Sequence, residues 1–323
     1  MTQIYNFPEN TKFLVTGGAG FIGSHLVDKL LDLNMKVIVL DDYSSGKKRN
    51  LQHVGGHKNL TLITGDIRDL ETCQKACTDI DYVLHQAALG SVPRSIEDPM
   101  TSHDVNVNGF VNMLKAATDN NVKRFVYASS SAVYGDEETL PKKEGIEGKL
   151  LSPYAVTKYI NELYANNFGT VYGLQTIGLR YFNVFGPRQD NDSIYAAVVP
   201  LFVKKLLENK APTINGDGLQ SRDFTYIDNV VDANLKACLA KENACGEAYN
   251  IAFGAREFLN DLYKKLSQLL DKDIKVHYGP DRVGDIKHSN ADISKAIQNL
   301  KYTPEIDLNK GLELSIQWYK ENV

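Results

Sequence analysis

The sequence is poor in cysteine. The four cysteines among 323 residues are Cys73, Cys77, Cys238 and Cys245. Cys73 and Cys77 lie four residues apart, but no second pair and no nearby histidine completes the spacing of a zinc site. The pattern therefore indicates reduced thiols and predicts no metal.

Long apolar runs and basic blocks are also missing. No stretch approaches the length needed to span a bilayer, and residues 1–10 show no charged-then-apolar signal pattern, so we expect no membrane partner and a cytoplasmic protein. The 36 basic and 40 acidic side chains give a net charge of -4. The densest basic run, Lys47–Arg49, is too short to follow a nucleic-acid backbone, and no nucleic-acid partner is expected.

Short apolar runs alternate with segments of helical periodicity through the first half of the chain. The expected strands cover 12–16, 36–40, 60–64, 82–84, 124–128 and 175–179, and the expected helices cover 22–33, 101–120 and 153–171. Apolar strands that alternate with helices predict an α/β fold, namely a doubly wound parallel (Rossmann) sheet covered on both faces.

The pattern changes after about residue 183, where turn clusters such as 215–218 separate shorter elements. We expect a Rossmann domain over 1–183 and a smaller α/β substrate domain over 184–323. The first domain is expected to be rejoined by about 225–252, where a helix-like segment precedes a strand-like one.

A glycine-rich turn follows the first strand. Gly18, Gly20 and Gly23 match the motif G-x-G-x-x-G. Gly17, Gly20 and Gly23 match the related motif G-x-x-G-x-x-G. Strand, tight turn and helix in this order bring the backbone and a helix N-terminus close to a pyrophosphate. The segment therefore predicts a dinucleotide site.

The end of the second strand indicates which dinucleotide binds. A carboxylate at Asp41 accepts ribose hydroxyl hydrogens from NAD and repels the 2′-phosphate of NADP. NAD is therefore favoured, although Lys47–Arg49 leave NADP open. Residues after the third and fourth strands are placed to line the same site: Asp66, Ile67, Gln86, Ala87 and Ala88.

A tyrosine and a lysine lie four residues apart in a predicted helix. Tyr154 and Lys158 share one helical face, and a nearby cation lowers the pKa of a phenol. Ser129–Ser131 follow the fifth strand at the carboxyl edge of the sheet, where ligands bind in this fold. A hydroxyl there is placed to relay a proton between substrate and Tyr154.

The chain resembles the extended short-chain dehydrogenase/reductases, in particular the nucleotide-sugar 4-epimerases that act on UDP-N-acetylglucosamine or its uronic acid. The resemblance runs from about residue 12 to the C-terminus. It rests on TGGAGFIG, LDDYSSG, GDIRD, HQAALGSVPRS, SSSAVYG, SPYAVTKY, LRYFNVFGPRQ, SRDFTYIDNV and GPDRVGDIKHS.

The resemblance implies roles for individual residues. Tyr154 is the expected base, Lys158 its electrostatic partner and Ser130 the proton relay. Further cofactor contacts are implied at Gly17, Gly20, Phe21, Ile22, Gly23, Asp41, Asp42 and Tyr181. The implied substrate contacts are Gly90, Ser91, Arg94, Ser130, Asn183, Ala197, Arg222, Arg282, Asp285 and Ser289.

Two positions distinguish sister activities in this family. Dehydratases of this family have Asp and Glu at the two positions after the relay residue, and decarboxylases have Glu at the second of them. This sequence has Ser131 and Ala132 at these two positions. The expected reaction is therefore NAD-dependent C4 epimerisation through a 4-keto sugar. Small residues at Ala197 and Ser289 favour an N-acetylated sugar, and Ser91, Arg94 and Arg188 are the candidate donors to a C6 carboxylate.

Alternatives stay open at this point. UDP-glucose or UDP-glucuronate is an alternative substrate, and a dehydratase, a C4 reductase or a non-catalytic NAD-sensing protein is an alternative function. The resemblance also implies a homodimer and a role in polysaccharide precursor synthesis. Its expected interface lies on the helices over 101–120 and 153–171, with candidate residues Asn112, Met113, Ala116, Tyr159 and Leu163.

Overall fold

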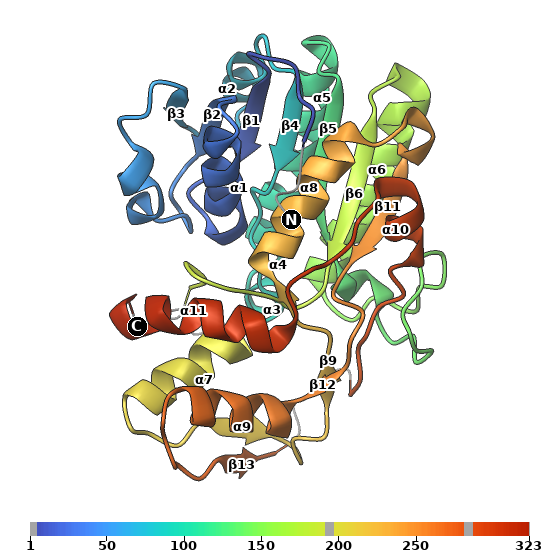
Figure 1. Cartoon of the computed structure of the whole chain (residues 1–323). Coiled ribbons are helices and arrows are strands. Elements are labelled where there is room, and N and C mark those ends of the chain that lie inside the picture. The colour runs from blue at the N-terminus through green and yellow to red at the C-terminus, as the bar shows by residue number, and fades with distance from the viewer. Residues whose placement is uncertain (1–4, 191–196, 281–286, 323) are drawn as a thin grey trace.

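A seven-stranded parallel sheet forms the centre of the protein, seen in a computed structural model that describes residues 5–190, 197–280 and 287–322 (Figure 1). The strand order is β11-β6-β5-β4-β1-β2-β3, and every pairing in the sheet is parallel. The strands are β1 (Lys12–Thr16), β2 (Lys36–Asp41), β3 (Leu60–Thr64), β4 (Tyr82–His85), β5 (Arg124–Ser130), β6 (Thr176–Tyr181) and β11 (Glu247–Ile251). The predicted doubly wound sheet is confirmed.

Alternate side chains of the strands pack against helices on the two faces. Val15 and Val39 belong to one apolar core, which includes residues of α1 (Phe21–Asp32) and α8 (Ile227–Leu239). Leu14 on the opposite face belongs to a second core. That core is completed by α2 (Leu70–Ala76), α5 (Gly109–Asp119) and α6 (Pro153–Tyr172). Strands buried on both faces are therefore mostly apolar.

The single helix expected over 101–120 is instead three elements: α4 (Pro99–His103), a π-helical turn at Asp104–Asn108, and α5. The wider turn contains Asn106, whose side chain accepts a hydrogen bond from the Leu89 amide (2.7 Å) and donates to Thr157 on α6 (3.2 Å). The prediction of one regular helix was wrong because these long-range hydrogen bonds are invisible to local periodicity.

A second group of elements lies below the sheet in Figure 1, beyond its carboxyl edge. It contains α7 (Val198–Leu207), α9 (Leu259–Leu269), α11 (Leu308–Asn322) and the strand pairs β8 (Thr213–Asn215) with β13 (His277–Gly279) and β9 (Ser221–Arg222) with β12 (Glu257–Phe258). β7 (Val184–Phe185) pairs with β10 (Thr225–Tyr226), and α10 (Ser294–Leu300) contacts β11.

Short elements fill the loops around the sheet. They are the helix α3 (Val92–Glu97) and the 3-10 turns at Lys48–Val54, Ser131–Tyr134 and Glu242–Ala244. Among the described residues, none of the helices has the length and apolar composition required to cross a membrane.

Candidate active site

A cavity of about 1090 Å³ lies across the carboxyl edge of the sheet. Most of the predicted site residues form its wall. They are Gly17, Gly20, Phe21, Ile22, Gly23, Asp41, Asp42, Asp66, Ile67, Gln86, Ala87, Ala88, Gly90, Ser130, Tyr154, Lys158, Tyr181, Asn183, Arg222 and Ser289. The cavity therefore joins the predicted cofactor and substrate positions in one space.

Other predicted residues are placed elsewhere. Ser91, Arg94 and Ala197 are not among the described residues of the cavity wall. The Ser91 hydroxyl instead accepts a hydrogen bond from the Arg94 amide (3.2 Å) at the start of α3. Arg282 and Asp285 lie outside the described residues.

The glycine loop between β1 and α1 is shaped for close approach. Gly17 has φ of +66°, a left-handed conformation that favours glycine. A side chain at Gly23 would collide with the Gly17 carbonyl oxygen, so the loop can turn this tightly only without Cβ atoms there. No side chain caps the first turn of α1, which leaves its N–H groups open to a phosphate. The loop fits a dinucleotide pyrophosphate.

Asp41 at the end of β2 holds this loop from behind. Its carboxylate accepts hydrogen bonds from the backbone amides of Ala19 (2.8 Å) and Tyr43 (2.8 Å). Burial raises the pKa of Asp41, and these two amides oppose the rise. Each carboxylate oxygen retains a second lone pair. The side chain can therefore position the loop and still accept a ribose hydroxyl, as predicted for NAD.

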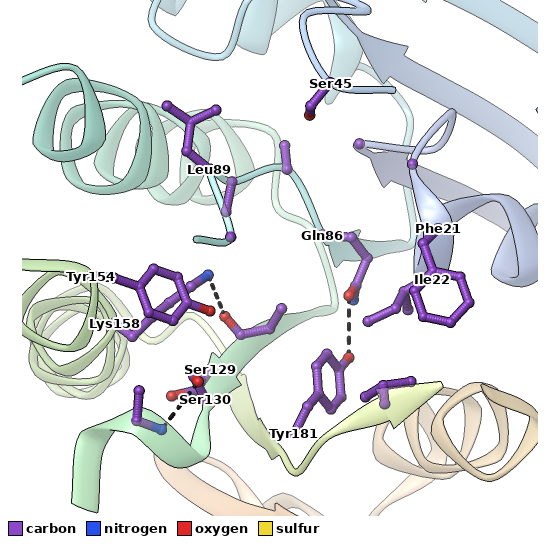
Figure 2. Close-up of a pocket in the computed structure, with 18 of the residues that line it drawn as sticks. Phe21, Ile22, Ser45, Gln86, Leu89, Ser129, Ser130, Tyr154, Lys158 and Tyr181 are labelled. Carbon is purple, nitrogen blue, oxygen red and sulfur yellow. Dashed lines mark hydrogen bonds between the residues drawn. The ribbon is translucent and has the colours of Figure 1, made fainter. Parts of the chain in front are cut away.

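The opposite wall of the dinucleotide half comes from β3, β4 and β6. Asp66 accepts two hydrogen bonds from the Arg68 guanidinium, which holds the pKa of Asp66 below its usual range. The Tyr181 hydroxyl donates to Gln86 Oε1 (3.2 Å), a contact drawn in Figure 2. Gln86 donates in turn to Asn234 of α8 (3.1 Å). This chain of hydrogen bonds fixes the side chains at the centre of the cavity.

The reacting side chains converge from two elements. Tyr154 and Lys158 project from the first turns of α6 toward Ser130 at the end of β5 (Figure 2). Ser152 caps the helix by accepting a hydrogen bond from the Ala155 amide (3.2 Å), which starts α6 just before Tyr154. The Lys158 ammonium donates to the Ala128 carbonyl (2.9 Å) and lies 5.9 Å from the centre of the Tyr154 ring.

Burial perturbs both titratable groups. It raises the pKa of Tyr154, a rise that a hydrogen bond with Ser130 opposes, and it lowers the pKa of Lys158 to about 8. The protein alone therefore does not lower the pKa of the phenol. The lowering expected from the sequence requires the additional positive charge of an oxidised nicotinamide ring.

Sequence reasoning missed a buried ion pair directly behind these residues. Glu162, one turn after Lys158, accepts hydrogen bonds from Arg180 of β6 (2.9 and 2.7 Å) and from Ser129 of β5 (2.5 Å). Arg180 also pairs with Glu147 (2.6 Å). The sequence shows that Lys158 and Glu162 are four residues apart on one helix. It does not show that Glu162 bonds to Arg180 and Ser129 on the strands.

Asn183 and Arg222 reach the cavity from the second group of elements. Asn183 has φ of +31°, and its side chain donates to the Asp223 carbonyl (3.2 Å). Arg222 of β9 donates to the carbonyl oxygen of Ser221 (2.9 Å). The resemblance implies that these two residues contact the sugar diphosphate, and a guanidinium such as that of Arg222 matches phosphate geometry.

The fold and the cavity indicate the class of this protein: a dinucleotide-binding α/β protein whose cavity brings a tyrosine and a lysine beside a serine. Residues 13–252 match the model of the NAD dependent epimerase/dehydratase family. The chain belongs to this family. The recognition of an extended short-chain dehydrogenase/reductase is thereby confirmed.

Three solved structures are similar to this chain over nearly their whole length. The UDP-N-acetylglucosamine 4-epimerase of Methanobrevibacter ruminantium, in complex with UDP-N-acetylmuramic acid, is 41% identical with a TM-score of 0.93, covering 98% of this chain and 100% of its own. The UDP-glucose 4-epimerase of Thermotoga maritima, with UDP-glucose, is 36% identical with a TM-score of 0.90 and coverage of 96% and 99%.

The third is a UDP-glucuronic acid 4-epimerase of Bacillus cereus, solved with NAD and a fluorinated UDP-glucuronic acid. It is 32% identical with a TM-score of 0.90 and coverage of 97% and 100%. Together these similarities support NAD-dependent UDP-sugar 4-epimerase activity for this chain. The three enzymes are named for different sugars, so the similarities do not indicate which sugar this chain uses.

Proposed function

We propose that this protein catalyses the reversible C4 epimerisation of a UDP-N-acetylhexosamine or its uronic acid, with tightly bound NAD. The substrate pairs are UDP-GlcNAc with UDP-GalNAc, or UDP-GlcNAcA with UDP-GalNAcA. Bound NAD would supply reversible hydride transfer at C4. The observation that carries the proposal is the convergence of Ser130, Tyr154 and Lys158 on one wall of a cavity whose opposite half fits a dinucleotide.

Each side chain has a distinct part in this reaction. Tyr154 takes the proton of the 4-hydroxyl, directly or through Ser130, and returns a proton to the 4-keto sugar on reduction. Lys158 supplies a fixed positive charge close to the phenol. Asn183 and Arg222 hold the UDP diphosphate, so that the keto sugar stays bound while it turns over.

The distribution of acidic groups favours epimerisation over elimination of water. The carboxylates in the described cavity wall are Asp41, Asp42, Asp66 and Asp190. Asp41 ends β2, and Asp42 and Asp66 follow β2 and β3 at the dinucleotide half. Asp190 pairs with Lys47 of the loop after β2 (2.6 Å). Ser131 and Ala132, which also line the cavity, offer no acid or base to remove a proton from C5.

The choice of an N-acetylated sugar rests on one small residue. Ser289 lines the cavity and leaves room beside the hexose, whereas Ala197 is outside the described wall. The similarity to a UDP-N-acetylglucosamine 4-epimerase supports the same choice. UDP-glucose or UDP-glucuronate is the alternative substrate, supported by the other two neighbours.

The test is an NMR assay without added cofactor. UDP-N-acetylglucosamine and its uronic acid are incubated separately with the purified protein, and the H3–H4 coupling is followed. A small coupling that appears over time marks the galacto epimer and establishes a 4-epimerase with retained NAD. No turnover of these sugars, nor of UDP-glucose or UDP-glucuronate, even with added NAD, would refute the proposal.

A further inference from the structure

The cavity wall is divided by charge. Its described carboxylates all lie at the dinucleotide half, whereas its described cations are Lys142, Lys158 and Arg222. Lys158 is held beside Tyr154 by the Ala128 carbonyl, and Arg222 lies on β9 in the second group of elements. Lys142 belongs to neither the catalytic group nor the predicted diphosphate site, so its presence in the wall needs a separate explanation.

Lys142 is fixed by its backbone between two loops. Its amide donates to the Asn290 carbonyl (2.8 Å), and its own carbonyl accepts from the Asp292 amide (2.9 Å) and from the Asn250 side chain (2.9 Å). The residue is 2% exposed. It therefore occupies a defined position beside Ser289, on the segment that follows the turn after Ser130.

The ammonium of Lys142 is incompletely satisfied. It donates to the Glu137 carbonyl oxygen and has no salt bridge to any carboxylate in the described part of the chain. An ammonium has three N–H groups, so two lack a protein acceptor there. Burial lowers the pKa of Lys142, and the carboxylates of Glu137 and Glu138 oppose this fall without forming a salt bridge to it. Burying a lysine without an anionic partner is costly, and lysines that are buried are normally paired.

An anionic group on the bound sugar would supply that partner. We propose that Lys142 binds a carboxylate carried by the hexose, so that the preferred substrate is a UDP-linked uronic acid. This assignment rests on the proposed function. A carboxylate accepts hydrogen bonds from the two remaining N–H groups and balances the charge of the ammonium. A hydroxymethyl group is neutral and cannot balance that charge.

The donors that the sequence suggested for this carboxylate do not compete with Lys142. Ser91 and Arg94 are outside the described cavity wall. Arg188 pairs with Asp28 of α1 (2.7 Å) and donates to the Asn50 carbonyl (3.2 Å), on the dinucleotide side of the sheet. Of the described cations in the wall, Lys142 alone has no assigned role in chemistry or diphosphate binding.

The test compares two substrates that differ only at C6. For wild-type protein, kcat/KM is measured for UDP-GlcNAcA and for UDP-GlcNAc, and their ratio is expected to exceed one. Lys142→Met keeps the apolar stem and is expected to lower this ratio about 10- to 100-fold, the usual cost of losing a charged hydrogen bond. Lys142→Arg keeps the charge and is expected to restore most of it. Lys143→Met, at the exposed neighbouring position, is the matched control.

A second readout separates the sugar from the diphosphate. Inhibition by UDP alone is expected to be equal in wild-type protein and Lys142→Met, because UDP carries no sugar carboxylate. Equal losses on both substrates, together with weaker UDP inhibition, would overturn the proposal and place Lys142 on the diphosphate. Equal losses with normal UDP inhibition would also overturn it, by giving the residue a packing role.

The substrate preference of the wild-type protein tests the assignment of Lys142 even if the variants fail to fold. A preference for UDP-GlcNAc over the uronic acid overturns the assignment of Lys142 while leaving the epimerase intact. A preference for the uronic acid supports the assignment and is expected to change little with salt, because a charge pair buried in the cavity is screened far less than a pair at the surface. No turnover of any UDP-sugar refutes the proposed function instead.

Discussion

The Lys158 ammonium donates a hydrogen bond to the carbonyl oxygen of Ala128, 2.9 Å away, and this contact ties α6 to β5 beside the reacting groups. Lys158 and Tyr154 project from α6, whereas Ser130 lies two residues beyond Ala128 on β5. One hydrogen bond therefore fixes the distance between the proposed base and its relay. It also holds a buried positive charge, which the Glu162 carboxylate one turn further along α6 stabilises as well.

The first prediction concerns the base. Tyr154→Phe removes the hydroxyl of the proposed base and is expected to lower kcat about 100- to 10,000-fold. Bound NAD, read from the absorbance of the purified protein, should persist because the ring remains. Tyr172→Phe, at the exposed end of the same helix, serves as the control. Near-normal turnover by Tyr154→Phe would remove Tyr154 from the mechanism.

The second prediction uses the pKa of Lys158. Its pKa of about 8 in the folded protein lies below that of an unfolded lysine, so the unfolded chain binds the extra proton. Stability contributed by this group is therefore lowest below pH 8 and rises with pH up to about 10.4, by at most about 3 kcal/mol.

The measurement is urea unfolding of nucleotide-free wild-type protein and Lys158→Met. The difference in unfolding free energy, wild type minus variant, is expected to grow from pH 7 to about pH 10. A difference that is flat or shrinks over this range would show that Lys158 is stably protonated in the folded state.

The third prediction concerns the glycine loop. Gly23→Ala places a Cβ against the Gly17 carbonyl oxygen, which must displace the loop that fits the pyrophosphate. The purified variant should carry little NAD and should bind added NAD weakly in calorimetry. Gly56→Ala, where a Cβ meets no atom within 4 Å, is the control. Full NAD content in Gly23→Ala would mean that the pyrophosphate does not contact this loop.

The sequence predicted the sheet well because its strands are buried on both faces and therefore stand out as continuous apolar runs. The glycine loop and the Tyr154–Lys158 pair were equally legible, since each depends on local spacing. The partners of Lys142 and Glu162 were not. Most of these partners lie on other elements of the fold, such as Arg180, Ser129 and Asn290, and no local pattern encodes such contacts.

A fourth prediction tests the buried ion pair of Glu162 and Arg180. Glu162→Gln leaves the Arg180 guanidinium with a single carboxylate, Glu147, and is expected to lower the free energy of unfolding by about 3 kcal/mol. Glu71→Gln, which breaks an exposed pair with Lys75 on α2, should cost far less in the same urea titration. Equal effects of the two substitutions would mean that the buried pair contributes no more than a surface pair.

The last prediction is that the protein is a homodimer. Met113 and Ala116, two of the interface candidates, are fully buried in the core behind the sheet and cannot contact a second chain. Leu163, another of the candidates, is exposed on α6, and the exposed Ile96 and Met100 lie on the neighbouring helices α3 and α4. An exposed apolar surface of this kind is typical of an interface between chains.

Light scattering is therefore expected to give about twice the mass of one chain, because burial of these side chains in a second copy removes them from water. Leu163→Glu places a charge in that surface and should shift the mass toward a monomer. Lys320→Glu, near the end of α11, changes charge away from these helices and should leave the mass as it is. A monomeric wild-type protein at micromolar concentration would contradict the prediction. A dimer that withstands Leu163→Glu would instead place the interface on another face.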